Sequence, residues 1–324
     1  MVAVAKAHPN IALVKYWGKR SEAEMLPDVG SISITVSGML TTTKLAWDDP
    51  EANTDGRDVV IVNGESRPDE VGKVSAWLSR FREHNNISRF ARVESINDFP
   101  TGAGLASSAS GFAALAAAAF ADAELSPTRE ELSRWARRGS VSAARSLHGG
   151  FVELFREGDS HATQILAEDE WPLDVHIAIT SSLRKDVGST SGMKTSAERC
   201  PYYGAWVESQ EADLQTAREA IAAKDFEKLA VITEESCLKM HSVMMATPPG
   251  LIYWNAGTLE VVHRVRELRR QGVGVTYTID AGPQVKVICE PQNSERVKDA
   301  LNDLKGIERL IHAGLGGDIE VTRQ

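Results

Sequence analysis

The sequence predicts a protein of two lobes that contains both strands and helices. Three observations lead to this prediction. The chain has 324 residues, more than one average hydrophobic core accommodates. Its first third carries short β-branched segments bounded by Gly, Asp and Pro, a pattern typical of strands. Residues 192–240, in contrast, follow a mostly helical pattern with one expected break at 223–225.

The elements of the first lobe follow from local composition. Residues 106–123 are very rich in Ala, the best helix former, and predict a helix. Pro127 is expected to open the next helix with Ser126 as its N-cap, because Pro fits the first helical turn. The other elements predicted for this lobe are strands at 31–36, 42–47, 59–62, 90–95 and 151–155 and a helix at 68–84.

The second lobe is expected to begin after the acidic stretch 168–170. We place the boundary before Asp174, which gives lobes of residues 1–173 and 174–324. A helix at 255–271 is expected to end at Gly272, since Gly readily adopts the left-handed conformation that terminates helices. The remaining predicted elements are strands at 175–180, 273–279, 285–289 and 308–312 and a helix at 294–304.

Composition excludes several classes of function. The formal net charge is -9, whereas proteins that bind nucleic acid present a basic face. No window approaches 18 uninterrupted apolar residues, so neither a membrane span nor a membrane partner is expected. Three cysteines without a CxxC pair argue against a disulfide framework or a zinc site. We therefore expect a cytoplasmic protein that acts on a small molecule.

Residues 97–111 (NDFPTGAGLASSASG) are the most informative segment. A strand leads into a loop of Pro, Gly and Ser that opens the Ala-rich helix. Small residues let backbone N–H groups approach a phosphate chain, and the helix N-terminus adds partial positive charge. Hydroxyls of Ser107, Ser108 and Ser110 can donate hydrogen bonds or help to hold a phosphate-bound Mg²⁺. The segment lacks GxxxxGK[ST] and the third Gly of a dinucleotide-binding fingerprint.

The order Pro-x-x-x-Gly-Leu-x-Ser-Ser-Ala in this loop resembles the second motif of the small-molecule kinases that act on galactose, homoserine, mevalonate and phosphomevalonate. Three further segments, 9–20, 136–150 and 278–283, are similar to those of one branch of that superfamily, the diphosphomevalonate decarboxylases. The resemblance covers nearly the whole chain. For the loop it implies ATP contacts from Pro100, Gly102, Gly104, Leu105, Ala106, Ser107 and Ser108.

The resemblance also implies a fold and a reaction. The fold would be α+β, a two-lobed small-molecule kinase fold with the active site in the cleft between the lobes. With ATP and Mg²⁺, the enzyme would phosphorylate the 3-hydroxyl of mevalonate 5-diphosphate and release isopentenyl diphosphate, CO₂, ADP and phosphate. A homodimer is the family expectation. Three alternatives stay open: the same chemistry on mevalonate 5-phosphate giving isopentenyl phosphate, a 3-kinase without decarboxylation, and a non-catalytic ligand-binding relative.

Residues 9–20 place cations among apolar neighbours. If 11–15 is extended, Lys15 shares a face with Ile11 and Leu13. A lone Lys in such a position usually extends its ammonium group to solvent. Here Lys15, Lys19 and Arg20 cluster with Tyr16 in the sequence, and this pattern favours an anion clamp. The resemblance implies that Lys15 supports the reacting centre, while Tyr16 and Lys19 hold the phosphate end of the substrate.

Residues 140–145 (SVSAAR) combine hydroxyls with an arginine. Ser142 and Arg145 are three residues apart and share a helical face. Arg suits bidentate binding of a carboxylate or phosphate. The alternative is an ordinary solvated helix face, because Arg134, Arg137 and Arg138 precede it. By resemblance, Arg145 binds the carboxylate that leaves as CO₂, and Ser140 and Ser142 contact the diphosphate.

Asp280 follows an apolar strand and precedes a Gly-containing turn. An Asp in that position usually only starts the turn. It is also a good position for a general base, and the resemblance implies that role. Ser189 matches a substrate-binding serine of the family.

Five positions depart from the family pattern. Gly188 stands in place of a serine, and Gln284 in place of an asparagine. Arg199 and Cys200 replace a Thr-Ser pair, and Lys73 is the nearest counterpart of an arginine that contacts the terminal phosphate. These departures concern the phosphate end of the substrate more than the chemistry.

Overall fold

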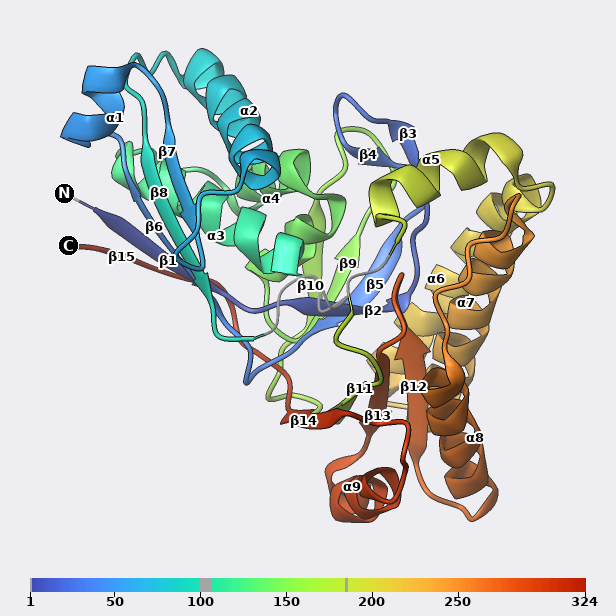
Figure 1. Cartoon of the computed structure of the whole chain (residues 1–324). Helices are drawn as coiled ribbons and strands as arrows, with labels where there is room; N and C mark the ends of the chain where they lie inside the picture. The colour runs from blue at the N-terminus through green and yellow to red at the C-terminus, as the bar shows by residue number, and fades with distance from the viewer. Residues whose placement is uncertain (1, 100–106, 184–185) are drawn as a thin grey trace.

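The structure, a computed structural model, describes residues 2–99, 107–183 and 186–324 (Figure 1). Of the predicted ATP contacts, Pro100, Gly102, Gly104, Leu105 and Ala106 lie outside these ranges. Within them, the strands form one five-stranded sheet, two four-stranded sheets and a two-stranded hairpin. Helices pack against the sheets, which confirms the predicted mixture of strand and helix.

The five-stranded sheet joins the two ends of the chain. Its order is β15-β1-β6-β8-β7, and β15 (Glu320–Arg323) pairs antiparallel with β1 (Ala3–Ala7) (Figure 1). The final strand thus returns to the sheet in which the chain begins, while the lobe boundary at 173/174 stays a prediction. The other three strands are β6 (Thr41–Ala46), β7 (Val59–Val62) and β8 (Arg92–Asn97).

The Ala-rich segment forms α3 (Ser107–Asp122), which is buried on nearly every side. It packs with the aromatic side chains of α2 (Pro68–Asn85) and α4 (Arg129–Gly139), because methyl side chains allow close approach. Thr128 caps α4 by accepting a hydrogen bond from the Glu131 N–H at 3.1 Å. The prediction of Ser126 as N-cap is therefore wrong by two residues.

The two four-stranded sheets share one hydrophobic core. Apolar side chains of Ile11, Ile32, Val175 and Ile177 pack in this core with those of the paired helices α6 (Tyr203–Ala223) and α7 (Phe226–Ala246). One sheet has the order β10-β9-β5-β2, with β2 (Asn10–Val14), β5 (Ser31–Thr35), β9 (Phe151–Leu154) and β10 (Ala162–Leu166). The other has the order β12-β13-β11-β14, with β11 (Asp174–Ile179), β12 (Val275–Ile279), β13 (Val285–Cys289) and β14 (Arg309–Ala313).

Turn chemistry accounts for the confirmed helix ends. Between α6 and α7, Lys224 adopts a left-handed conformation (φ 52°), and the Asp225 side chain accepts from the Lys228 N–H, so the predicted break is confirmed. Gly272 has a φ of 80° just after the helix Ala256–Arg270, as expected of a terminating Gly. The remaining elements are α1 (Pro50–Asp55), β3 (Lys19–Ser21), β4 (Leu26–Pro27), η1 (Val141–Leu147), α5 (Ser189–Arg199), α8 (Ala256–Arg270), η2 (Pro291–Asn293) and α9 (Ser294–Asn302).

No helix in the described ranges combines the length and the apolar character needed to cross a bilayer.

Candidate active site

A carboxylate held between two lysines lies directly after β12. Lys15 Nζ donates to Asp280 Oδ1 at 2.6 Å, and Lys286 Nζ lies 2.9 Å from Oδ2. The lysine side chains are 1% and 3% exposed, whereas that of Asp280 is 27% exposed. Asp280 is thus the member of the trio that a bound molecule can reach. Lys15 does not extend its ammonium group to solvent as a lone Lys usually does, because Asp280 supplies a partner inside the protein.

Burial and charge oppose each other in this trio. Burial by itself raises the pKa of Asp280, but the ammonium groups of Lys15 and Lys286 outweigh it and hold that pKa below its usual range. Burial lowers the pKa of Lys15, and the Asp280 charge acts in the opposite direction. Asp280 is therefore ionised at neutral pH and has little tendency to keep a proton.

Arg145 reaches the same region from η1 and is buried. Its Nε and Nη2 donate to Asn10 Oδ1 at 3.3 and 3.0 Å, and its Nη1 donates to Ser31 Oγ. Burial lowers the pKa of Arg145 to about 10, so it remains a cation at neutral pH. Of the five guanidinium N–H groups, these bonds leave one on each terminal nitrogen for a ligand.

Tyr16 lies against this guanidinium, with its ring centroid 5.9 Å from the Arg145 Cζ. Burial raises the pKa of Tyr16 to about 12, while the Arg145 charge opposes that shift. The phenol therefore stays protonated and able to donate a hydrogen bond.

A row of hydroxyls connects the start of α3 with η1. Ser108 Oγ lies 3.4 Å from Ser140 Oγ, which lies 3.2 Å from Ser142 Oγ. The structure thus brings a predicted ATP contact next to two predicted substrate contacts. Ser110 differs, because its buried hydroxyl lies 2.6 Å from Thr41 Oγ1. The expectation that Ser110 serves a phosphate is wrong for this geometry.

A cavity of about 340 Å³ opens beside the N-terminus of α3. Ser107 and Ser108 line one end, and Lys73 lines it from α2. Apolar walls come from Val60, Val62, Val74, Val93, Phe112 and Leu115. Sequence reasoning placed Lys73 at the terminal phosphate of the substrate, but the structure places it in this cavity with the two serines.

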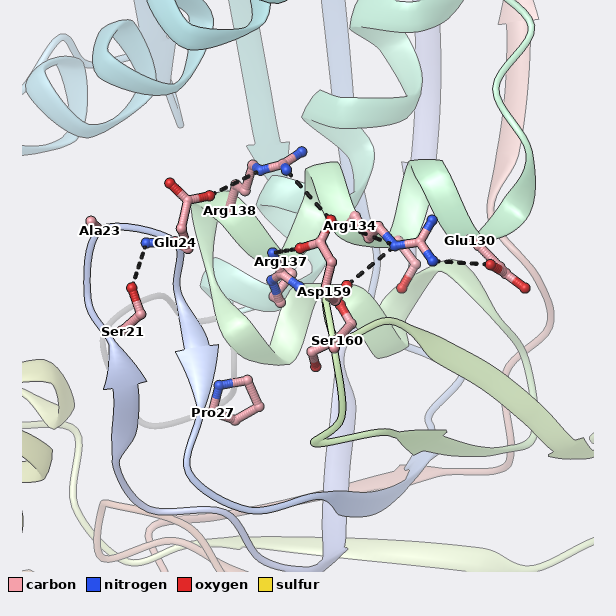
Figure 2. Close-up of polar contacts among 12 residues, drawn as sticks. Ser21, Ala23, Glu24, Pro27, Glu130, Arg134, Arg137, Arg138, Asp159 and Ser160 are labelled. Carbon is pink, nitrogen blue, oxygen red and sulfur yellow. Dashed lines mark hydrogen bonds and ion pairs between the residues drawn. The ribbon is translucent and has the colours of Figure 1, made fainter.

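The hairpin of β3 and β4 carries Lys19 and is fastened by arginines. Arg80 of α2 donates to the Ala23 carbonyl at 2.8 Å and to Glu24 at 3.1 Å. Arg138 of α4 lies 3.7 Å from the other Glu24 oxygen (Figure 2). These contacts hold the tip of the hairpin against α2 and α4.

Three of the four arginines of α4, Arg134, Arg137 and Arg138, converge on one carboxylate (Figure 2). Arg137 is buried and donates to Asp159 Oδ1 at 2.6 Å. Arg134 and Arg138 lie 3.7 and 3.6 Å from Asp159 Oδ2. The alternative interpretation, a solvated arginine face shared with Arg145, is wrong because Arg137 is internal and paired.

A second cavity of about 330 Å³ lies between this hairpin and α5. Lys19 lines it from the hairpin, and Thr190, Met193 and Lys194 line it from one face of α5. Burial lowers the pKa of Lys19, with Glu22 acting in the opposite direction. In the described part of the chain, neither Lys19 nor Lys194 has a carboxylate within 4.0 Å. Ser189 is the first residue of α5 and directly precedes Thr190 of this lining.

The departures from the family pattern have structural explanations. Gln284 accepts from the Thr180 N–H at 2.7 Å and donates to the Ser181 carbonyl at 2.6 Å, so it braces the turn after Asp280. Cys200 is buried in a core cluster. Gly188 is the N-cap of α5 and has no side chain that could cap it. Arg199 ends α5 and is exposed.

Sequence reasoning missed several residues that the structure brings to this site, Lys286 and Asn10 among them. Lys286 interrupts the otherwise apolar strand β13, and that interruption was the available signal. Asn10 starts β2 and also donates to the Ser142 carbonyl at 2.9 Å and to Ser146 Oγ at 2.7 Å. Nothing in its local sequence distinguishes it from a turn residue.

The donor set fits Mg²⁺ bound through phosphates rather than a protein metal centre. In the described ranges, no three His, Cys, Asp or Glu side chains could hold a metal ion together. Mg²⁺ commonly keeps several waters and binds substrate phosphates with one or two protein oxygens. The hydroxyls of Ser107 and Ser108 that line the cavity beside α3 suit that role.

Two protein-family descriptions match almost the whole chain. Residues 7–165 match the diphosphomevalonate decarboxylase-like N-terminal domain, and residues 175–313 match the mevalonate 5-diphosphate decarboxylase C-terminal domain. The chain is 33% identical to a diphosphomevalonate decarboxylase of Candida albicans, over 99% of this chain and 98% of that protein. It is 32% identical to a phosphomevalonate decarboxylase of Haloferax volcanii, over 99% and 98% of the respective chains.

Solved structures agree with the sequence comparisons. The structure described as "MDDEF in complex with MVAPP, AMPPCP and Magnesium" is 37% identical, covers 100% of this chain and 99% of its own, and superposes with a TM-score of 0.91. This likeness confirms the two-lobed α+β fold that the motifs predicted. The chain therefore belongs to the diphosphomevalonate decarboxylase family.

Proposed function

We propose that this chain is an ATP-dependent decarboxylase that converts mevalonate 5-diphosphate to isopentenyl diphosphate, CO₂, ADP and phosphate. The observation that carries the proposal is Asp280, a reachable carboxylate clamped by Lys15 and Lys286 within 3 Å. The family's named relatives and the complex with MVAPP, AMPPCP and magnesium support the reaction and its need for ATP and Mg²⁺.

Asp280 orients the tertiary 3-hydroxyl toward the γ-phosphate of ATP. Its lowered pKa makes it a weak base, so it contributes a fixed negative charge and a hydrogen-bond acceptor more than early proton removal. Phosphoryl transfer passes through a loose transition state and depends mainly on positioning and electrostatics. The hydroxyl proton can therefore leave late, onto Asp280.

Lys15 and Arg145 act on opposite parts of the substrate. Lys15 holds Asp280 in one rotamer and adds positive charge where the transferred phosphoryl group arrives. The two terminal N–H groups left on Arg145 suit the substrate carboxylate, which must stay in line with the departing 3-phosphate. Loss of CO₂ then supplies the electrons that expel that phosphate.

The nucleotide occupies the cavity beside α3 in this proposal. Its valine and aromatic walls suit a flat base, while Ser107, Ser108 and Lys73 suit the phosphates. Mg²⁺, when bound with ATP, neutralises charge on these phosphates. Lys73 thus serves the nucleotide rather than the second substrate.

The diphosphate end of the substrate runs past Tyr16, Ser140 and Ser142 toward Lys19, with Ser189 at the start of α5. The cavity between the hairpin and α5 adds Lys194 to Lys19 at this end, which favours a diphosphate over a monophosphate. The runner-up is mevalonate 5-phosphate, because a relative of similar identity is named phosphomevalonate decarboxylase. Separate assays with the two substrates decide between them. A kcat/KM for the monophosphate that equals or exceeds the diphosphate value would favour the runner-up.

Oligomeric state, cellular location and the lobe boundary are inferred from the family. We infer a cytoplasmic homodimer whose lobes divide at 173/174, by analogy with the family. Sedimentation of the purified chain tests the dimer.

A further inference from the structure

β12, which leads into Asp280, is an edge strand of its sheet. In an antiparallel pair, the backbone groups of alternate residues point away from the partner strand and need other partners. At Ile279, side chains of α7 supply them. The Ile279 N–H donates to Cys237 Sγ at 3.3 Å, and the Ile279 carbonyl accepts from His241 Nε2 at 3.2 Å and from Cys237 Sγ at 3.6 Å.

His241 has one tautomer in this arrangement. Its Nε2 faces a carbonyl oxygen, so that nitrogen carries the proton. Burial lowers the pKa of His241 to about 3, and the ring is neutral at physiological pH. The ring centroid of Trp254 lies 4.9 Å from that of His241. Within the described ranges, His241 Nδ1 has no hydrogen-bond partner, and neither has Trp254 Nε1. A buried polar ring with an unsatisfied nitrogen lowers the stability of the fold, whereas an apolar residue at this position would avoid that desolvation penalty.

Side chains of α7 and of its neighbour α6 also hold the backbone of Lys15. The Lys15 N–H donates to Ser236 Oγ of α7 at 2.9 Å. Gln210 of α6, with its amide oriented to satisfy both neighbours, donates to the Lys15 carbonyl at 3.0 Å and accepts from Trp206 Nε1 at 2.9 Å. Lys15 and Asp280 are 265 residues apart in sequence, so their 2.6 Å contact depends on how each backbone is fixed.

We propose that Ser236, Cys237 and His241 form a positioning face that sets the distance and direction of the Lys15–Asp280 pair. Their hydrogen bonds go to the backbones of Lys15 and Ile279 and not to the Lys15 ammonium or the Asp280 carboxylate. They therefore act on the pair through the backbone. The inference rests on the proposed function in taking that pair as the reacting centre. It assigns residues of α7 a role in positioning the reacting groups, and it explains why a buried imidazole stands at position 241.

The test compares three variants in the full chain. His241→Phe keeps an aromatic ring but loses the donor to Ile279, whereas the amide nitrogen of His241→Gln reaches the position of Nε2. Val243→Ala, buried on the same helix and unable to hydrogen-bond the backbones of Lys15 or Ile279, is the control for loss of packing. We expect His241→Phe to lower kcat by about tenfold to a hundredfold with KM values within about twofold, since small misplacements have effects of this size. His241→Gln should recover most of the kcat, and Val243→Ala should lower only Tm.

Two results would overturn the inference: a kcat for His241→Phe equal to that of Val243→Ala, or a His241→Gln variant no better than His241→Phe. If the unaltered chain shows no turnover of mevalonate 5-diphosphate, the proposed function has failed, and hydrogen exchange then tests the positioning claim alone. Faster exchange of the Ile279 amide in Cys237→Ala, which removes the acceptor of that amide, than in Val243→Ala supports it. Equal exchange contradicts it.

Discussion

The reacting centre and the phosphate end of the site are built in different ways. Lys15 and Asp280 meet in a contact between segments 265 residues apart, and buried Lys286 reaches Asp280 through the pairing of β12 with β13. Lys19 and Lys194 instead line an open cavity between an arginine-fastened hairpin and one helix face. Removal of a buried partner leaves a desolvated charge, while an exposed lysine contributes mainly screened attraction. We therefore expect substitutions in the buried trio to lower kcat strongly. Substitutions of the cavity lysines should mainly change the preference between substrates.

Asp280→Asn should have the largest effect. It keeps the size of the side chain but removes the charge and the acceptor that orients the 3-hydroxyl, so ADP formation should fall by about 10²- to 10⁴-fold. CO₂ release should fall in parallel, because decarboxylation needs the 3-phosphate. A lowered Tm with unchanged kcat in the folded fraction would show that Asp280 only starts the turn.

Arg145→Lys should come next, with decarboxylation reduced by about 10²-fold, the scale of a misplaced reacting group. An ammonium cannot bind Asn10, Ser31 and a carboxylate in the fork geometry of a guanidinium. Measured kcat for CO₂ release checks this, and a near-normal value would remove Arg145 from the carboxylate site.

Lys286→Met should change the pH dependence. Loss of one of the two cations raises the pKa of Asp280 toward its usual range, so activity carried by the ionised form is lost at a higher pH as the solution is acidified. Breaking the buried pair should also destabilise the fold by about 3 kcal/mol. The shift is tested by comparing the acid limbs of the kcat–pH profiles of Lys286→Met and the unaltered chain. Coincident limbs would show that Lys286 does not lower the pKa of Asp280.

Lys194→Gln should have the smallest effect and should act on substrate choice. We expect KM for mevalonate 5-diphosphate to rise about three- to tenfold with little change for the monophosphate, because one partly exposed charge contributes about 1 kcal/mol. Lys305→Gln, on the loop after α9, is the control for loss of a surface charge. Equal effects on both substrates would remove Lys194 from the terminal-phosphate site.

The two regions also differ in how well the sequence predicts them. Ser140, Ser142 and Arg145 lie in one short motif, so their proximity follows from local spacing. The contact of Lys286 with Asp280 follows from the pairing of β12 with β13, in which Ile279 lies opposite Val285, and no motif contains it. Asn10 reaches Arg145 only through the packing of β2 against η1.

Local patterns predict the long helices and the strands rich in β-branched residues, and they miss elements that lack such a local signal. The strand at 59–62 and the helix break at 223–225 match, because β-branched runs and capping residues act locally. β1 is missed because its Ala-rich segment lacks β-branched side chains apart from Val4, and its pairing with β6 and β15 defines it. The position of Lys73 is misjudged for a similar reason, since the direction of α2 depends on its packing over the five-stranded sheet.

The coupling of phosphorylation to decarboxylation is the central claim, and product stoichiometry tests it most directly. Purified protein is incubated with ATP, Mg²⁺ and mevalonate 5-diphosphate, and ADP, CO₂ and isopentenyl diphosphate are quantified in one time course. The account predicts equal amounts of all three at every time point. ADP that accumulates without CO₂ would contradict it and would identify a kinase that stops at the 3-phosphate.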